Sequence, residues 1–384
     1  MNEACQLLGV RSQTIYAYVS RGKLEVMADP ADTRRSLYRA EDVAALAKRK
    51  QAGRKRETLA ANTLYGSEPS IPTALCAFFR GRLYYRGQDA VQLARSASVE
   101  EVAQLLWAAE HPVDFSYTVP SAPGPARPPG RAAAFTVLAG LAAEGHSTRG
   151  RLTRVLHNEG QRLVAQLANS FGARPGREPL HLRFARGWKQ SAQVADLLRT
   201  AMVLLVDHEL TSSAFVARIA TSTGASLPAC LLAGLATLSG PLHGDASVRV
   251  HALFSEVERL GEDQVVAHYL STGLPLPGFG HHLYPDGDPR AAALLALFEP
   301  PEVIARFIQK VTALTGLQPN IDVALAALVA HHRLPADAAF GLFATARSVG
   351  LLAHSLEQLT GAQVIRPRGR YVGPIPEIAQ GVRL

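Results

Sequence analysis

Two histidines and one aspartate stand in short segments that are rich in turn residues. His243 lies in GPLHGDA, His281 in PGFGHHLYPDGDPR and Asp322 in QPNIDVAL. A carboxylate can remove a proton next to a carbonyl group, and a neutral imidazole can donate a hydrogen bond to the enol oxygen that forms. A second imidazole can polarise the carbonyl group that the enol carbon attacks. The three residues therefore predict chemistry that forms a carbon–carbon bond.

The surroundings of the two histidines favour neutral rings and close approach of a ligand. His243 follows a Gly-Pro turn and precedes a helical stretch, whose positive N-terminal end disfavours the imidazolium. His281 directly follows Gly280, which lets the backbone approach a ligand closely, so we prefer it to the neighbouring His282. Helix capping without catalysis is the alternative for His243 and for Asp322.

Several further cations are placed where they could hold an anionic ligand. Arg290 follows an Asp-Pro pair that starts a predicted helix, and a guanidinium fixed there can bind a carboxylate through two hydrogen bonds. Arg347 lies in an apolar helical segment, where an unpaired charge is costly, so it needs an anionic side chain or a bound substrate. Other candidates are His208 in VDHELTSS and, in IRPRGRYVG, Arg366, Arg368 and Arg370. Together these cations predict a di- or tricarboxylate ligand.

Helical periodicity dominates the chain from residue 132 onward, and the body is expected to be all-α. We expect helices over 132–144, 149–171, 190–206, 209–222, 226–239, 289–298, 301–315, 320–332, 335–346 and 348–360. The Ser98-x-x-Glu101 capping box predicts a helix that ends near Trp107, and alternation around 82–85 predicts a hairpin arm. Prolines and glycines predict a loop over 116–131. They also interrupt the apolar stretch 226–242, which therefore indicates a buried helix and not a membrane span.

The composition is typical of a soluble globular protein with two or three domains. Of the 384 residues, 47% are hydrophobic and 19% are charged. The three cysteines, Cys5, Cys76 and Cys230, match no metal-ligand spacing, so we expect no metal site. Their small, odd number predicts reduced thiols in the cytoplasm, and no secretion signal is recognisable at the start of the chain.

Excess positive charge is concentrated near the N-terminus. Residues 1–58 hold 12 Lys and Arg against 7 Asp and Glu, whereas residues 59–384 hold 28 against 25. Gly9 ends a first short predicted helix, and Ser12 caps a second, which is the helix-turn-helix pattern. An extended arm and a helix from about Glu41 follow. This arrangement resembles the winged helix-turn-helix of MerR-type regulators and excisionases.

That resemblance implies that the second helix enters the major groove of DNA. The residues that would face DNA are Arg11, Gln13, Thr14, Tyr16 and Tyr18, and those that would reach backbone phosphates are Arg34 and Arg35. The basic segment KRKQAGRKR is interpreted as a linker, so this domain is assigned to residues 1–58. A helical docking module whose basic face is merely solvated is the alternative.

The motifs of the body together resemble the citrate synthase family. GPLHG, PGFGH…DPR, NID, the arginine-containing helix before SVG, and RPR occur in the order and spacing of that family. YYRGQDAVQLARSASVEEVAQLLW is similar to its N-terminal region. The resemblance covers residues 70–375 and implies the all-α citrate synthase fold over 59–384, with a small mobile subdomain at approximately 247–335. A helix-turn-helix before such a body resembles a known bacterial variant of citrate synthase-like proteins.

The resemblance also implies a role for each site residue. Asp322 would remove a proton from acetyl-CoA or propionyl-CoA, His243 would stabilise the enol, and His281 would donate to the keto oxygen of oxaloacetate. Citrate or 2-methylcitrate would form, with a coenzyme A thioester as co-substrate and no permanently bound cofactor. Oxaloacetate would be held by His208, Arg290, Arg347 and, from the second subunit of a homodimer, Arg366. The coenzyme A adenine pocket would be lined by the backbone of Leu276, Gly278, Phe279 and Gly280.

Three positions depart from the residues that are usual in the family. Pro285 stands where many members carry a basic residue that contacts a coenzyme A phosphate, and Thr211 and Ser247 each replace an asparagine. Two other hypotheses remain open: a ligand-sensing DNA-binding regulator built on a synthase body, and cleavage in the manner of a citryl-CoA lyase. We favour the condensing enzyme because a sensor has no need of a proton-abstracting Asp322.

Overall fold

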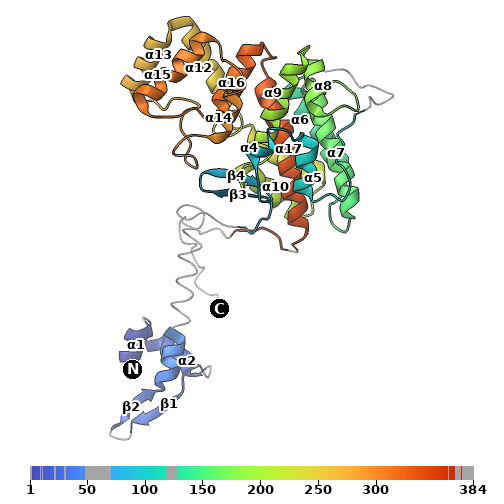
Figure 1. Cartoon of the computed structure of the whole chain (residues 1–384). Coiled ribbons are helices and arrows are strands. Elements are labelled where there is room, and N and C mark those ends of the chain that lie inside the picture. The colour runs from blue at the N-terminus through green and yellow to red at the C-terminus, as the bar shows by residue number, and fades with distance from the viewer. Residues whose placement is uncertain are drawn as a thin grey trace. The chain divides into compact units, whose positions relative to one another are not determined.

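The computed structural model divides the chain into two compact units, each with its own hydrophobic core (Figure 1). It describes all residues except 1, 9, 11, 21–22, 30–31, 48–70, 118–127, 362, 368–372 and 374–384. The first unit comprises Met1–Pro72 and Pro367–Leu384, and the second comprises Thr73–Arg366.

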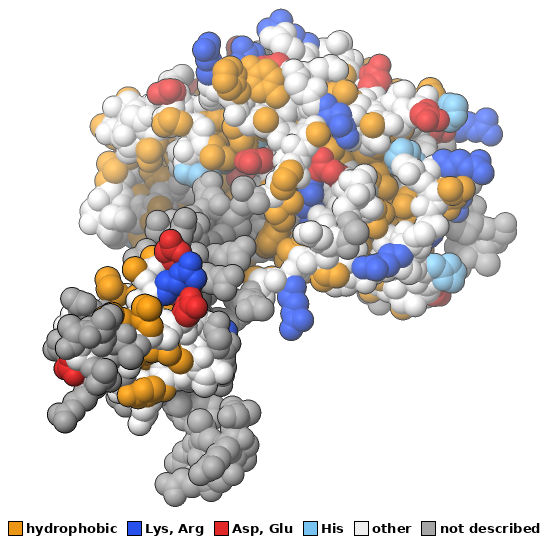
Figure 2. All heavy atoms as spheres, turned by 90° about the horizontal axis from the view of Figure 1, so that it is seen from below, with side chains coloured by type: hydrophobic (Ala, Val, Ile, Leu, Met, Phe, Trp, Pro, Cys, Tyr) orange, Lys and Arg blue, Asp and Glu red, His pale blue; other side chains and the backbone are white. Residues whose placement is uncertain are grey.

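The first unit contains short helices and one hairpin. Its elements are α1 (Asn2–Leu8), α2 (Ser12–Ser20), β1 (Val26–Asp29), β2 (Asp32–Tyr38) and a helical stretch over 40–47. The two strands are antiparallel, with Met27 opposite Leu37. The buried core residues are Ala4, Leu8, Ile15, Leu24 and Val43, so α1, α2 and the 40–47 stretch share one core. Hydrophobic side chains also lie on the surface of this unit (Figure 2), among them Tyr16 and Met27.

The second unit begins with a three-stranded antiparallel sheet. Its strands are β3 (Cys76–Phe79), β4 (Arg82–Tyr85) and β5 (Gln88–Asp89), which confirms the predicted hairpin arm. Both turns consist of an Arg-Gly pair with positive φ, the backbone that tight two-residue hairpins need. The Tyr85 hydroxyl lies 3.1 Å from the carbonyl oxygen of Val203 and 3.3 Å from that of Asp207. The sheet is therefore anchored next to His208.

The rest of the described part of this unit is built from helices. They are α4 (Ala90–Leu93), α5 (Val99–Trp107), α6 (Arg131–Glu144), α7 (Thr153–Ser170), α8 (Leu180–Gly187), α9 (Ala192–Leu205), α10 (Ser212–Ser222), α11 (Leu227–Leu238), α12 (Ala246–Leu260), α13 (Glu262–Thr272), α14 (Pro289–Leu295), α15 (Glu302–Thr315), α16 (Ile321–His332) and α17 (Ala338–Leu359). The predicted capping box is present at the start of α5.

Two sequence predictions about helices were wrong. We predicted separate helices over 335–346 and 348–360, but the structure has the single helix α17. The apolar pattern breaks at Arg347, yet the helix continues because the Leu205 carbonyl accepts from that guanidinium. The helices α4, α8 and α13 were not predicted, and α12 was expected only as a helical stretch of undefined length after His243.

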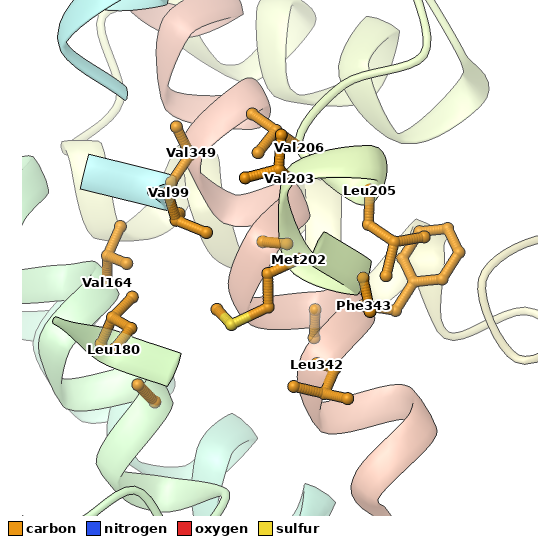
Figure 3. Packing of buried hydrophobic residues seen from close by; sticks show 14 of the residues in the cluster. Val99, Val164, Leu180, Met202, Val203, Leu205, Val206, Leu342, Phe343 and Val349 are labelled. Atoms are coloured by element: carbon orange, nitrogen blue, oxygen red, sulfur yellow. The ribbon is translucent and has the colours of Figure 1, made fainter. Parts of the chain in front are cut away.

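The larger hydrophobic core surrounds α9 and α17. Figure 3 shows its tight packing, in which Met202 and Val203 of α9 and Leu342 and Val349 of α17 are fully buried. The apolar helix α11 lies in the same core, as predicted for this stretch. No helix in the described ranges combines the length and apolar character that a membrane crossing requires.

A second, smaller core lies among α12, α13, α15 and α16, which Figure 1 shows grouped apart from α5, α6 and α7. The helix α16 contributes to both cores. Leu325 and Leu328 pack into the larger core, whereas Val323 and Ala327 pack into the smaller one. Burial on two sides explains why α16 is apolar around most of its circumference. Its first turn, which carries Asp322, therefore begins where the two cores meet.

Gly350 lies where α17 passes close to the end of α9. A methyl group there would collide with the carbonyl oxygen of Val206 and would lie 2.8 Å from a carboxylate oxygen of Asp207. We expect Gly350→Ala to lower the free energy of unfolding by about 1–3 kcal/mol, the usual cost of overpacking. Gly361→Ala is the control, because its methyl group meets only the Gln358 carbonyl oxygen, at 3.7 Å. Urea denaturation that gives both variants equal unfolding free energies would contradict this packing.

Candidate active site

Three rings from two distant segments form the centre of the candidate site. His208 is buried after the end of α9, and its Nε2 lies 3.1 Å from the Tyr284 hydroxyl. The ring centroid of His281 lies 5.3 Å from that of His208 and 4.9 Å from that of Tyr284. Burial, followed by the Arg290 guanidinium, lowers the pKa of His208 well below its usual value. His208 is therefore neutral near pH 7.

His281 has a defined tautomer in this arrangement. Its Nδ1 accepts a hydrogen bond from the backbone N–H of Leu283, at 3.1 Å. Since Nδ1 acts as an acceptor, the single proton of the neutral ring lies on Nε2. Burial and then the Arg290 guanidinium lower the pKa of His281 to about 4. The residue thus offers one N–H donor, at Nε2, near neutral pH.

His243 lies in the turn between α11 and α12. Its Nε2 is 2.8 Å from the hydroxyl oxygen of Ser213 in the first turn of α10, and that oxygen is 3.1 Å from the Thr211 hydroxyl. Burial, and after it the Arg347 guanidinium, lowers the pKa of His243 to about 4. The ring is therefore neutral near pH 7, and burial is the main cause of its lowered pKa. The contact with Ser213 occupies Nε2 and leaves Nδ1 for a ligand.

Asp322 lies in the first turn of α16 and follows the N-cap residue Asn320. The Asn320 side chain accepts from the backbone N–H of Asp322 at 3.0 Å. The Oδ1 atom of Asp322 is buried and has no hydrogen-bond partner within the described part of the chain. Burial raises the pKa of Asp322 to about 7, and Asp288 acts in the same direction while the Arg290 guanidinium opposes it. Such a carboxyl group can serve as a base near neutral pH.

The buried side chain of Asp288 connects the segments that carry His281 and Asp322. It caps α14 by accepting from the backbone N–H of Arg290, and it accepts from the backbone N–H of Ile321 at 3.0 Å. It also pairs with the Arg290 side chain through two hydrogen bonds of 3.0 and 2.8 Å. This ion pair holds the pKa of Asp288 below its usual value despite burial. The sequence predicted only that Asp288 starts a helix.

Arg290 and Arg347 are both buried, and each guanidinium group donates a hydrogen bond from Nε to another group of the protein. Arg290 uses Nε and Nη2 to bind Asp288, and Arg347 donates from Nε to the Leu205 carbonyl oxygen at 3.0 Å. Arg347 makes no ion pair with a carboxylate of the described residues, although Asp207 opposes the burial that lowers its pKa. In both guanidinium groups the edge between Nη1 and Nη2 remains for an anionic ligand.

Six predicted residues lie in one region, close enough for the charges of Arg290 and Arg347 to shift the pKa values of the other four. Arg347 affects the pKa of His208, His243 and Asp322, and Arg290 affects the pKa of His208, His281 and Asp322. Arg366 is exposed and not at this site within the same chain. The backbone N–H of Ile365 next to it donates to Ser222 at the opposite end of α10 from Ser213.

The segment 276–280 is tied to the start of α16. Gly278 and Gly280 have φ values of 82° and 75°, which favour glycine. The Gly278 carbonyl accepts from the backbone N–H of Asn320 at 2.8 Å, and the Gly280 N–H donates to Gln318 at the same distance. The intervening Phe279 side chain belongs to the smaller core, as does that of Leu276.

Sequence reasoning missed two hydroxyl groups that contact the site histidines. Ser213 and Tyr284 lie in VDHELTSS and HHLYPDG, which were singled out for other residues. Local spacing did not reveal their contacts, because Ser213 contacts His243, 30 positions away, instead of the neighbouring His208. Among the residues that the structure places, no group of three or more His, Cys, Asp or Glu is arranged to hold a metal ion.

Comparisons with known proteins give the same relatives by sequence and by structure. The family model described as citrate synthase, C-terminal domain, matches residues 138–368. A putative citrate synthase 2 of Mycobacterium tuberculosis is 36% identical over 194 residues, which are 47% of this chain and 52% of that protein. The chain thus spans about half the length of this relative. The citrate synthase of Haloferax volcanii is 28% identical over 341 residues, 76% of this chain and 90% of that protein.

Solved structures show the same fold. The citrate synthase of Thermotoga maritima has a TM-score of 0.67 at 24% identity, covering 82% of this chain and 96% of that chain. The citrate synthase of Thermoplasma acidophilum, in a ternary complex with carboxymethyl coenzyme A and oxalateacetate, has a TM-score of 0.66 at 22% identity, covering 81% and 96%. Since the family model matches more than half of the chain, this protein belongs to the citrate synthase family.

Proposed function

We propose that the protein condenses acetyl-CoA or propionyl-CoA with oxaloacetate to give citrate or 2-methylcitrate and free coenzyme A. The observation that carries this proposal is the buried Oδ1 of Asp322, which has no hydrogen-bond partner in the described ranges and belongs to a carboxyl group with a pKa of about 7. A carboxylate buried in this way is costly for stability. A catalytic role would explain why the protein has this buried carboxylate. Membership of the citrate synthase family supports such a role for Asp322.

Three side chains would divide the chemistry. Ionised Asp322 would take a proton from the carbon next to the thioester carbonyl, while His243 donates a hydrogen bond to the oxygen that becomes the enol. The enol carbon would then attack the keto carbon of oxaloacetate, and the Nε2–H of His281 would donate to the keto oxygen. Water would hydrolyse the resulting thioester and release coenzyme A.

The two buried arginines would hold the carboxylates of oxaloacetate through their Nη edges. Their fixed positions suit such binding, since little rotamer freedom is left to lose. His208 would contact the same ligand from beside His281. The backbone of Leu276, Gly278, Phe279 and Gly280 would line the adenine pocket for coenzyme A. The comparison structure in complex with carboxymethyl coenzyme A and oxalateacetate supports these two ligand classes.

We further propose a homodimer in which Arg366 of the second subunit completes the oxaloacetate site. Apolar side chains near the His243 turn support a surface that another chain covers. Leu242 is 90% exposed and Val248 is 48% exposed. Both residues lie close in sequence to His243 and expose apolar surface that a second subunit would cover. The separate smaller core supports a mobile subdomain at about residues 247–335, whose closure would exclude water from the enol.

The N-terminal unit is proposed to bind DNA as a winged helix-turn-helix in a cytoplasmic protein. Gln13 and Tyr16 are exposed on α2, as recognition residues should be, and Thr14 is half-buried. Tyr18 differs from our expectation, because it packs partly against the core of this unit. Arg11 and the side chains of Arg34 and Arg35 lie outside the described residues.

Thiol release from acetyl-CoA and from propionyl-CoA in the presence of oxaloacetate tests the catalytic proposal. We expect turnover with at least one ester, and Asp322→Asn should lower kcat by about 10²–10⁴-fold, because it removes the general base. Asp286→Asn is the matched control, since Asp286 is an exposed carboxylate between His281 and Arg290. Folded wild-type protein that releases no thiol from either ester would refute the proposal.

The Ser213 hydroxyl is expected to orient His243 for catalysis. Ser213→Ala removes the 2.8 Å contact with Nε2 and leaves a half-buried imidazole without this partner. A cost of about 1–3 kcal/mol in the transition state corresponds to a loss of about 5–150-fold in kcat, with KM for oxaloacetate little changed. Ser212→Ala, at the exposed neighbouring position, should keep wild-type kinetics. Similar kcat values for the two variants would show that the contact does not orient the ring.

Selection from a pool of random-sequence DNA duplexes tests the N-terminal unit. We expect the full chain to enrich a sequence motif, with affinity that falls as salt concentration rises. Gln13→Ala and Tyr16→Ala should each weaken binding to that motif, whereas Gln6→Ala on the exposed surface of α1 should not. Failure to enrich any motif at low salt would count against DNA recognition and in favour of a docking module.

A further inference from the structure

A cavity of about 580 Å³ lies beside the C-terminal end of α17 in the second unit. Its walls come from the β4–β5 turn, the end of α5, the residues around the start of α7 and the ends of α10 and α17. The ionisable residues that line it are Arg86, Arg149, Arg151, His157 and Glu357. Its volume falls within the range of about 300–1,000 Å³ that is usual for small-molecule sites.

The cavity is separate from the candidate active site. Glu357 follows Arg347 by ten residues on α17, which is about 15 Å along a helix that rises 1.5 Å per residue. Ser222 at the cavity follows Ser213 by nine residues on α10, a rise of about 14 Å. No residue proposed for catalysis or substrate binding lines the cavity. Any ligand of this cavity is therefore a second ligand, whatever reaction the active site performs.

Two of the charged groups at the cavity are already neutralised. Arg151 forms an ion pair of 2.5 Å with Glu159 on α7. Glu357 forms an ion pair with the buried Arg218, and its other oxygen accepts from the backbone N–H of Ala74 at 2.7 Å. Neither group adds a net charge that a ligand would need to balance.

The other two guanidinium groups carry charge that no described carboxylate balances. Arg86 donates from Nε to the carbonyl oxygen of Leu106 at 3.0 Å. Arg149 donates from Nη2 to the carbonyl oxygen of Ser222 at 3.3 Å. These bonds to neutral carbonyl groups leave both positive charges for an anion. The cavity is therefore electropositive.

The stacked rings of Trp107 and the half-buried His157 form part of the cavity wall. The Nε2 atom of His157 is buried without a hydrogen bond from or to any described residue. Burial lowers the pKa of His157, so the ring is neutral and can still donate or accept. It stacks on Trp107 with the ring centroids 5.9 Å apart and the planes 30° apart.

We propose that this cavity binds a small organic dianion, either a phosphate ester or a dicarboxylate. The anionic groups pair with Arg86 and Arg149, because guanidinium groups match the geometry of both phosphate and carboxylate oxygens. The apolar part of the ligand packs against the part of the cavity wall that Leu106 and the Trp107 ring form.

Isothermal titration calorimetry of the full chain with ADP and with succinate tests this site and distinguishes the two chemistries. We expect saturable binding of at least one probe that persists in Arg347→Ala, whose active site has lost an anion-binding group. Arg149→Gln should weaken that binding by about 10–100-fold, the effect of losing a charge-assisted contact. Arg86→Gln should act similarly, and both variants are measured because each arginine also donates to a backbone carbonyl group.

Arg154→Gln is the matched control, since Arg154 is an exposed arginine on α7 that does not line the cavity. It should leave the affinity of the probe unchanged. The proposal is overturned if neither probe binds at millimolar concentration, or if binding survives both Arg149→Gln and Arg86→Gln. Binding that disappears only in Arg347→Ala would assign the probe to the active site and would equally overturn it.

Discussion

The candidate active site depends on one buried carboxylate, that of Asp288. It joins the first turn of α14 to the backbone N–H of Ile321, and it holds the Arg290 guanidinium through two hydrogen bonds. His281 precedes this aspartate by seven residues and Asp322 directly follows Ile321. One side chain thereby sets the positions of the proposed proton donor, the proposed base and one anion-binding arginine. Removing one partner of such a buried pair typically costs about 3–5 kcal/mol, so the arrangement has little freedom to change.

Burial also produces the ionisation states that the proposed chemistry needs. It disfavours charge, so it lowers the pKa of His243 and His281 to about 4 and raises that of Asp322 to about 7. The guanidinium groups of Arg290 and Arg347 add to the first effect and oppose the second. The pKa of an aspartate in an unfolded chain is about 3.9. Between about pH 4 and 7, Asp322 therefore binds more protons in the folded chain than in the unfolded chain. The contribution of Asp322 to stability therefore falls as pH rises through that window.

Local sequence motifs predicted several residues of the candidate site, but they did not predict the contacts that join distant segments. The candidate residues that could be predicted from turn-rich motifs were His243, His281 and Asp322. By contrast, the pair of Ser213 with His243 and the pair of Asp288 with Ile321 span 30 and 33 positions, and no local pattern specifies such pairs. Helical periodicity predicted most of the body. It failed at Arg347, because the Leu205 carbonyl group that accepts a hydrogen bond from this guanidinium becomes its neighbour only in the folded core.

A carbon-13 NMR titration of the Asp322 carboxyl group tests the central claim most directly. Protein labelled at the aspartate side-chain carboxyl carbons would be titrated, and Asp322→Asn would identify the signal. Burial beside Asp288, opposed by the two arginines, predicts a midpoint near pH 7. A midpoint near the ordinary aspartate value of about 4 would mean that the carboxyl group is solvated and has no special environment. That result would contradict the account of Asp322 as a base held ready by burial.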